Sequence, residues 1–110
     1  MEFDKLVHQQ TRLRIFAYLY RHGETSFTDL KEALDVTEGN LASHIERMEE
    51  ADCVEVNKEF VDRKPRTTYR LTDRGREKFE DHIGTLESLI EGLASEESER
   101  SGADGDGASN

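Results

Sequence analysis

Four hydrogen-bonding side chains fall on one face of a short stretch with helical periodicity. They are Asn40, Ser43, His44 and Arg47. Arginine can donate two hydrogen bonds to O6 and N7 of guanine, and asparagine can pair with adenine in a similar way. Just before them, Thr37 can cap the helix, and Gly39 leaves the first amides open to a phosphate oxygen. This arrangement predicts a helix that inserts its polar face into the major groove of DNA.

A basic segment comes soon after this helix. Residues 57–70 carry a net charge of +3, although the whole chain carries −10. Three of its cations are Arg63, Lys64 and Arg66, and they separate two β-rich runs. The pattern predicts a hairpin whose turn spans 62–66 and includes Pro65, which has no amide hydrogen for a strand ladder. The tip of this hairpin should contact phosphates in a salt-sensitive and largely sequence-independent manner.

Three helices must position these residues. The first spans residues 10–22 and the second spans 27–34, directly after the capping residue Ser26. The third begins after Thr37 and ends near Ala51. Its inward face is formed by Leu41, Ile45 and Met48. The short link at 35–37 should make the second and third helices cross, as in a helix-turn-helix unit.

A long helix is expected after the hairpin, with Thr72 as its cap. Its apolar positions recur at steps of four and three, which is the spacing of a helix–helix seam. We expect this helix to span 73–94 and to complete a single domain of residues 1–94. Residues 95–110 contain no large apolar side chain, so they are expected to form a disordered acidic tail.

The amino-acid composition limits which class of protein this chain can be. The chain has 110 residues, of which 34% are hydrophobic, with 25 acidic and 15 basic side chains. No stretch approaches the ~20 apolar residues of a membrane helix, and no secretory signal is present, so we expect a cytoplasmic protein. An acidic surplus keeps proteins soluble where salt screens charge strongly, which favours a salt-rich cytoplasm such as that of a haloarchaeon.

Four stretches together resemble the winged-helix transcriptional regulators. They are residues 11–15 (TRLRI), 26–30 (SFTDL), 37–45 (TEGNLASHI) and 65–72 (PRTTYRLT). The chain is most similar to the small, stand-alone regulators of archaea and bacteria that are related to the MarR and ArsR families. The resemblance implies a mainly α fold with a β-hairpin wing (α+β), that is, a winged helix-turn-helix with a C-terminal dimerisation helix.

The same resemblance implies a homodimer that binds double-stranded DNA at specific sequences to regulate transcription. Helix three and the wing would hold the DNA, and the terminal helices would form the dimer contact. By position, the implied dimer residues are Phe3, Leu6, Phe79, Ile83, Leu86, Leu89, Ile90 and Leu93.

Three other functions remain open to the sequence. A metal-responsive repressor would need clustered metal ligands, but Cys53 stands alone and the four histidines are scattered along the sequence. Only Asp81 and His82 could contribute to a metal site, one shared between two chains related by a two-fold axis. A protein–protein interaction module on the same scaffold would tend to expose apolar residues on helix three. No motif of an enzyme or of a cofactor site is present, so we expect neither catalysis nor a bound cofactor.

Overall fold

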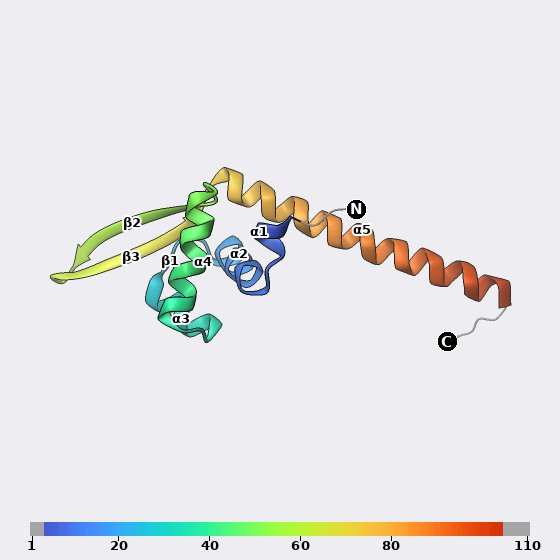
Figure 1. Cartoon of the computed structure of the whole chain (residues 1–110), viewed down its shortest axis with the longest axis horizontal. Coiled ribbons are helices and arrows are strands. Elements are labelled where there is room, and N and C mark those ends of the chain that lie inside the picture. The colour runs from blue at the N-terminus through green and yellow to red at the C-terminus, as the bar shows by residue number, and fades with distance from the viewer. Residues whose placement is uncertain (1–3, 105–110) are drawn as a thin grey trace.

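The computed structural model describes residues 4–104, with side chains as far as Ser95. Its elements in chain order are α1 (Lys5–His8), α2 (Gln10–His22), β1 (Thr25–Ser26), α3 (Phe27–Leu34), α4 (Glu38–Glu50), β2 (Val54–Val61), β3 (Lys64–Leu71) and α5 (Asp73–Asp104). The molecule is elongated, measuring 69 × 24 × 21 Å. The β2–β3 hairpin and α5 project from opposite sides of the helical body (Figure 1). This is a winged-helix fold, as the sequence predicted.

Three predicted capping residues begin their helices as expected. The hydroxyl of Ser26 accepts from the amide of Asp29 at 3.1 Å, and that of Thr37 accepts from Asn40 at 3.1 Å. Thr72 accepts from the amide of Gly75 at 3.0 Å at the start of α5. Each cap satisfies an amide that has no partner within its helix, so these short-range sequence signals set the helix starts.

Helices α2, α3 and α4 share one apolar core. On α4, Leu41, Ile45 and Met48 are buried, which confirms the predicted inward face. A guanidinium nitrogen of Arg14 on α2 donates to the carbonyl oxygen of Leu34 at 2.7 Å, tying the end of α3 to α2. The link between α3 and α4 then turns the chain at Asp35, whose φ of 55° is left-handed. The unit is a helix-turn-helix with α4 as its second helix.

The sheet has three antiparallel strands in the order β1-β3-β2. In the long hairpin, Val54 pairs with Leu71 at the body and Val61 pairs with Lys64 at the tip. The short strand β1 pairs Thr25 with Tyr69 and Ser26 with Thr68. Neither β1 nor the short helix α1 was predicted, because two and four residues are too few to show a period.

The predicted five-residue turn at 62–66 is wrong. Only Asp62 and Arg63 form the turn, and their φ angles of 51° and 66° are those that a two-residue type I′ turn requires. Pro65 lies in β3, opposite Phe60. Positions in an antiparallel pair alternate between hydrogen-bonded and non-bonded, and the pair next to a two-residue turn is bonded. Pro65 therefore takes a non-bonded position, where its missing amide hydrogen is not needed.

Helix α5 continues to Asp104, ten residues beyond its predicted end at 94. The expectation of disorder over 95–104 is therefore wrong. Alanine, glutamate and arginine in this stretch favour helix, and no proline interrupts it, so a lack of large apolar residues was not a stop signal. The remainder of the predicted tail, 105–110, lies outside the described residues. Between residues 4 and 104, no helix is both long and apolar enough to span a bilayer.

The start of α5 is joined tightly to the start of β2. The amide of Thr72 donates to the carbonyl oxygen of Cys53 at 3.0 Å, and the hydroxyl of Thr72 donates to the carbonyl of Asp52 at 2.7 Å. Gly75 lies one turn later, so close that a Cβ added there would meet the Cys53 oxygen at 2.1 Å. A glycine is required here because backbone, which cannot move aside, occupies the space of a side chain.

We predict that Gly75→Ala lowers the free energy of unfolding by about 3 kcal/mol, since either the β2 backbone or α5 must shift. Gly84→Ala is the control, because nothing lies within 4 Å of its added Cβ. In that helical position alanine should stabilise by about 1 kcal/mol. Urea unfolding of both variants measures the difference, and equal stabilities would show that the junction is not close-packed.

Candidate nucleic-acid interface

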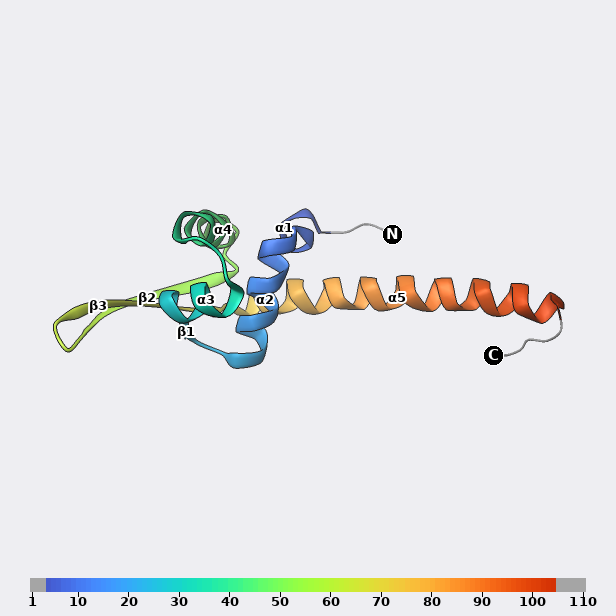
Figure 2. The same cartoon turned by 90° about the horizontal axis from the view of Figure 1, so that it is seen from below.

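Helix α4 presents most of the predicted reading residues to solvent. Gly39, Asn40, Ser43 and Arg47 are exposed, as is the cap Thr37, whereas His44 is half-buried. The burial of the opposite face sets this orientation. Figure 2 shows α4 along one side of the molecule, next to the base of the hairpin and remote from the free end of α5. One side of the fold thus combines an open polar helix with a projecting hairpin.

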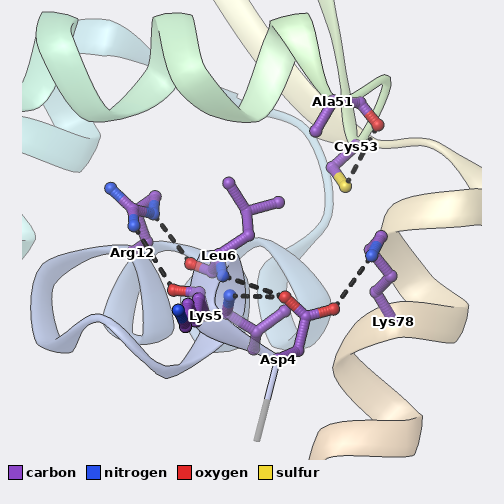
Figure 3. Close-up of polar contacts among 8 residues, drawn as sticks. Asp4, Lys5, Leu6, Arg12, Ala51, Cys53 and Lys78 are labelled. Carbon is purple, nitrogen blue, oxygen red and sulfur yellow. Dashed lines mark hydrogen bonds and ion pairs between the residues drawn. The ribbon is translucent and has the colours of Figure 1, made fainter.

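His44 is held by an arginine that the sequence analysis missed. A guanidinium nitrogen of Arg12 on α2 lies 3.1 Å from Nδ1 of His44. A guanidinium can only donate, so Nδ1 must accept and the ring is neutral with its proton on Nε2. Arg12 is itself anchored, because it donates to the carbonyl oxygens of Leu6 at 2.7 Å and of Lys5 at 3.4 Å (Figure 3).

The electrostatic environment of His44 favours that neutral ring. Burial lowers its pKa below the ordinary 6.5, and the positive charges of Arg12 and then Arg47 lower it further. Arg12 and Arg47 therefore make the flank of α4 beside the neutral His44 ring cationic. Arg12 is 32 residues from His44 in the chain, so only the packing of α2 against α4 could reveal its place in the site.

The other flank of α4 is acidic. Glu46 and Glu49 line a hollow between α4 and β2, which also contains Ser43 and Lys58. Neither glutamate was predicted as a site residue, because a polar run shows exposure but not which neighbouring element each side of the helix faces. A carboxylate at this position can accept a hydrogen bond from the amino group of cytosine, as glutamate does in major-groove readout.

The hairpin distributes its cations over both of its faces. Arg63 forms the turn, whereas Lys64 and Arg66 lie in β3 and are exposed. Cross-strand partners share a face and successive residues alternate, so Lys58 lies on the face opposite to Lys64 and Arg66. Lys58 was not predicted as a site residue. A hairpin with cations on both faces can bind between two phosphate backbones, such as those that border a groove.

The apolar residues of α5 divide into two groups. Phe79 is buried within the protomer, against Phe16 and Tyr20 at ring-centroid distances of 6.2 and 5.0 Å. Its predicted place in a dimer contact is therefore wrong, because α2 already covers it. Ile83 and Leu86 are half-buried. Leu89, Ile90 and Leu93 are exposed, the last two by 64% and 56%.

Of the two N-terminal residues in the predicted dimer contact, the structure describes only Leu6. Leu6 is half-buried and packs against the protomer's own core. Asp4, two residues earlier, accepts from Lys78 of α5 at 2.9 Å, so α1 is tied to α5 of the same chain (Figure 3). Phe3 lies outside the described residues.

A model of the winged helix DNA-binding domain matches residues 11–90 of the chain. The chain belongs to this family. It is 34% identical, over 81% of its length and 97% of the relative's, to an uncharacterised protein of Methanocaldococcus jannaschii. The structure of a transcriptional regulator homologue from Pyrococcus horikoshii OT3 has a TM-score of 0.77 and 33% identity, covering 82% of this chain and 89% of that one.

A further structure, described as a MarR-family transcriptional regulator from Enterococcus faecalis V583, has the same fold. Its TM-score is 0.68 at 24% identity, over 86% of this chain and 84% of that chain. Together with the family match, the similarity to the Pyrococcus horikoshii structure supports a DNA-binding regulator.

The metal-sensing alternative depends on where Cys53 and His82 lie. Among residues 4–95, no group of three or more potential ligands is close enough to hold a metal ion. Cys53 is buried, and burial raises the pKa of its thiol, which disfavours the thiolate that binds metals. His82 is buried at the contact of α5 with α1, where its Nε2 lies 3.3 Å from Nδ1 of His8. It is therefore poorly placed to serve a two-fold site between protomers.

The contact between Arg12 and His44 gives a testable pH dependence. We predict that His44 titrates below 6.5 in the wild type and that Arg12→Ala raises its pKa, since a neighbouring positive charge is lost. Because the pKa is lower in the folded than in the unfolded state, His44 contributes a loss of stability as the pH falls below 6.5. NMR titration of the His44 ring measures the pKa in both proteins.

Arg47→Ala is the matched control for this experiment, because the positive charge of Arg47 lowers the pKa of His44 less than that of Arg12 does. It should raise the pKa less than Arg12→Ala does. An unchanged or lower His44 pKa in Arg12→Ala would contradict the contact.

Proposed function

We propose that the protein is a transcriptional regulator that binds double-stranded DNA at specific sequences as a homodimer. It acts by binding and not by catalysis. The observation that carries the proposal is the exposed polar face of α4 beside a hairpin with cations on both faces. Fixed by its own apolar stripe, α4 can enter a major groove while the wing contacts the adjacent backbone.

The chemistry of the α4 face supports base recognition. Its outward residues offer amide, hydroxyl and guanidinium groups, and none of them is a large apolar side chain. A helix that bound a partner protein would be expected to expose apolar anchors at its centre. Gly39 near the helix start leaves room for a phosphate to approach the first amides, where the helix dipole favours negative charge.

The distribution of charge lets an acidic protein bind a polyanion. Residues 57–70 have a net charge of +3, while residues 72–110 contribute −7. Helix α5, which carries most of that acidic excess, projects away from the hairpin (Figure 1). We expect high salt to screen the remaining repulsion, so affinity should decline with salt less steeply than the wing cations alone would give. This expectation fits a protein of a salt-rich cytoplasm.

The homodimer is supported by the exposed apolar stripe of α5. A helix of 32 residues is about 48 Å long and cannot bury this stripe on its own small domain. Pairing with the same helix of a second protomer would cover Leu89, Ile90 and Leu93. Two protomers would then address half-sites about one helical turn, ~34 Å, apart.

Two substitutions separate base reading from backbone contact. We predict that Arg47→Ala weakens binding to a duplex selected from a random pool by about tenfold and leaves binding to random DNA nearly unchanged. Arg66→Ala should weaken both about equally and reduce the salt slope of log K by about 1. Fluorescence anisotropy over a range of potassium chloride concentrations measures both effects.

Arg21→Ala provides the control, because Arg21 is an exposed arginine at the C-terminal end of α2, remote from α4 (Figure 2). It should leave both affinities unchanged. If Arg47→Ala were silent on both duplexes, the reading face would be wrongly assigned.

The dimer is tested on α5. Ile90 is exposed in the protomer, so Ile90→Glu should leave the domain folded but introduce like charges into a paired seam. We predict that Ile90→Glu sediments as a single chain, whereas the wild type and Glu87→Gln sediment as dimers. A wild type that remained a single chain at all concentrations would exclude the homodimer.

A further inference from the structure

The hairpin ends in an exposed apolar pair. Phe60 is 77% exposed, more than any other large apolar side chain in the described part of the chain. Pro65, also exposed, is its direct cross-strand partner. Cross-strand partners project from the same face, so the two rings form one apolar patch on the wing.

This patch lies on the face of the hairpin that is turned toward the helix-turn-helix unit. Nearer the body, the same face carries the pair Lys58–Thr67 and then the pair Val56–Tyr69. Lys58 and Val56 line one hollow together with Ser43 of α4, and Pro65 lines another together with residues at the start of α3. A duplex bound to the outer face of α4 would therefore meet this face of the wing.

The surroundings of the patch indicate what covers it. Lys58 shares its face, Arg63 forms the adjacent turn, and Lys64 and Arg66 lie on the reverse face. An apolar patch among cations fits a partner that combines negative charge with flat apolar surfaces. Duplex DNA offers both, because phosphates border each groove and base pairs stack inside it. Apolar side chains that enter the minor groove act as wedges between base steps.

We propose that Phe60, backed by Pro65, is a wedge that enters the minor groove beside the major groove occupied by α4 and partly unstacks a base step. The inference rests on the proposed DNA binding. Phe60 lies four positions beyond Val56, which packs against the core, so the patch lies roughly 13 Å along the strand from Val56. Adjacent grooves are separated by about half a helical turn, or ~17 Å, which is a comparable distance. The left-handed turn at Asp62 and Arg63 keeps the hairpin narrow beyond the wedge.

The test uses the full chain and a duplex that the wild type selects from a random pool. Phe60→Ala should bind it about tenfold more weakly, with an unchanged salt slope because no charge is removed. Val61→Ala is the matched control, since Val61 is a neighbouring exposed apolar residue on the reverse face. It should bind like the wild type. With 2-aminopurine placed at successive positions of the duplex, the wild type should raise the fluorescence at one step and Phe60→Ala should not.

A third variant reports on the wedge directly. The chain contains no tryptophan, so Phe60→Trp introduces a single indole fluorophore at the patch. Its affinity should remain within about threefold of the wild type, and its emission should be quenched on binding as the indole stacks on a base. Quenching that titrates with the same midpoint as the anisotropy change supports the wedge.

Three results would overturn the inference. If Phe60→Ala bound the duplex as tightly as Val61→Ala and raised the same 2-aminopurine signal, the wedge would be wrong while DNA binding stood. If Phe60→Ala instead changed the sedimentation of the free protein, the patch would be a contact between proteins. If the wild type selected no duplex at any salt concentration, the proposed function would itself be wrong and the wedge with it.

Discussion

The rotation of α4 about its own axis is the constraint on which the rest of the site depends. Leu41, Ile45 and Met48 are buried in the common apolar core, and each contributes about 2 kcal/mol through burial. Successive helical residues are about 100° apart, so a shift of one position would bury a polar side chain and expose an apolar one. The apolar stripe therefore decides which side chains face outward, although none of its members touches DNA in the proposed complex.

The wing depends on the same body through a second anchor. Val54 and Leu71 are buried at the base of the hairpin, and the backbone of Cys53 and Thr72 joins the sheet to α5. From that base the strand register determines the face of every residue out to the turn. The fold thus separates three kinds of surface: a polar helix, a hairpin with cations and an apolar tip, and an acidic helix with an apolar stripe. This separation explains how a chain of net charge −10 can carry a site for DNA.

Sequence reasoning predicted most of the local structure and little of the long-range contact. Ser26, Thr37 and Thr72 were identified as caps because capping needs only residues three positions apart. The predicted hairpin turn is too long. Proline usually avoids strands, and an Asp-Arg pair is an uncommon type I′ turn, so neither residue type marks the two-residue turn. The length of α5 was underestimated, because helix can continue without a buried face where the residues favour it.

The candidate site was predictable to a similar degree. Asn40, Ser43 and Arg47 followed from periodicity, because the buried stripe determines the exposed face. The contact of Arg12 with His44 and the burial of Phe79 against α2 could not be predicted from periodicity. Both depend on how helices distant in sequence pack together. Phe60 and Pro65 of the wing are evident in the sequence, but only the strand register shows that they are cross-strand partners.

The central claim is that α4 and the wing bind one duplex together. The most direct measurement is an NMR titration of the nitrogen-15-labelled protein with a selected duplex, in which each backbone amide reports separately. We predict that amides of residues 39–47 and, apart from Pro65, of residues 58–66 shift with one common midpoint, while those of residues 87–93 do not respond. Shifts confined to α5, or two sets with different midpoints, would contradict the account.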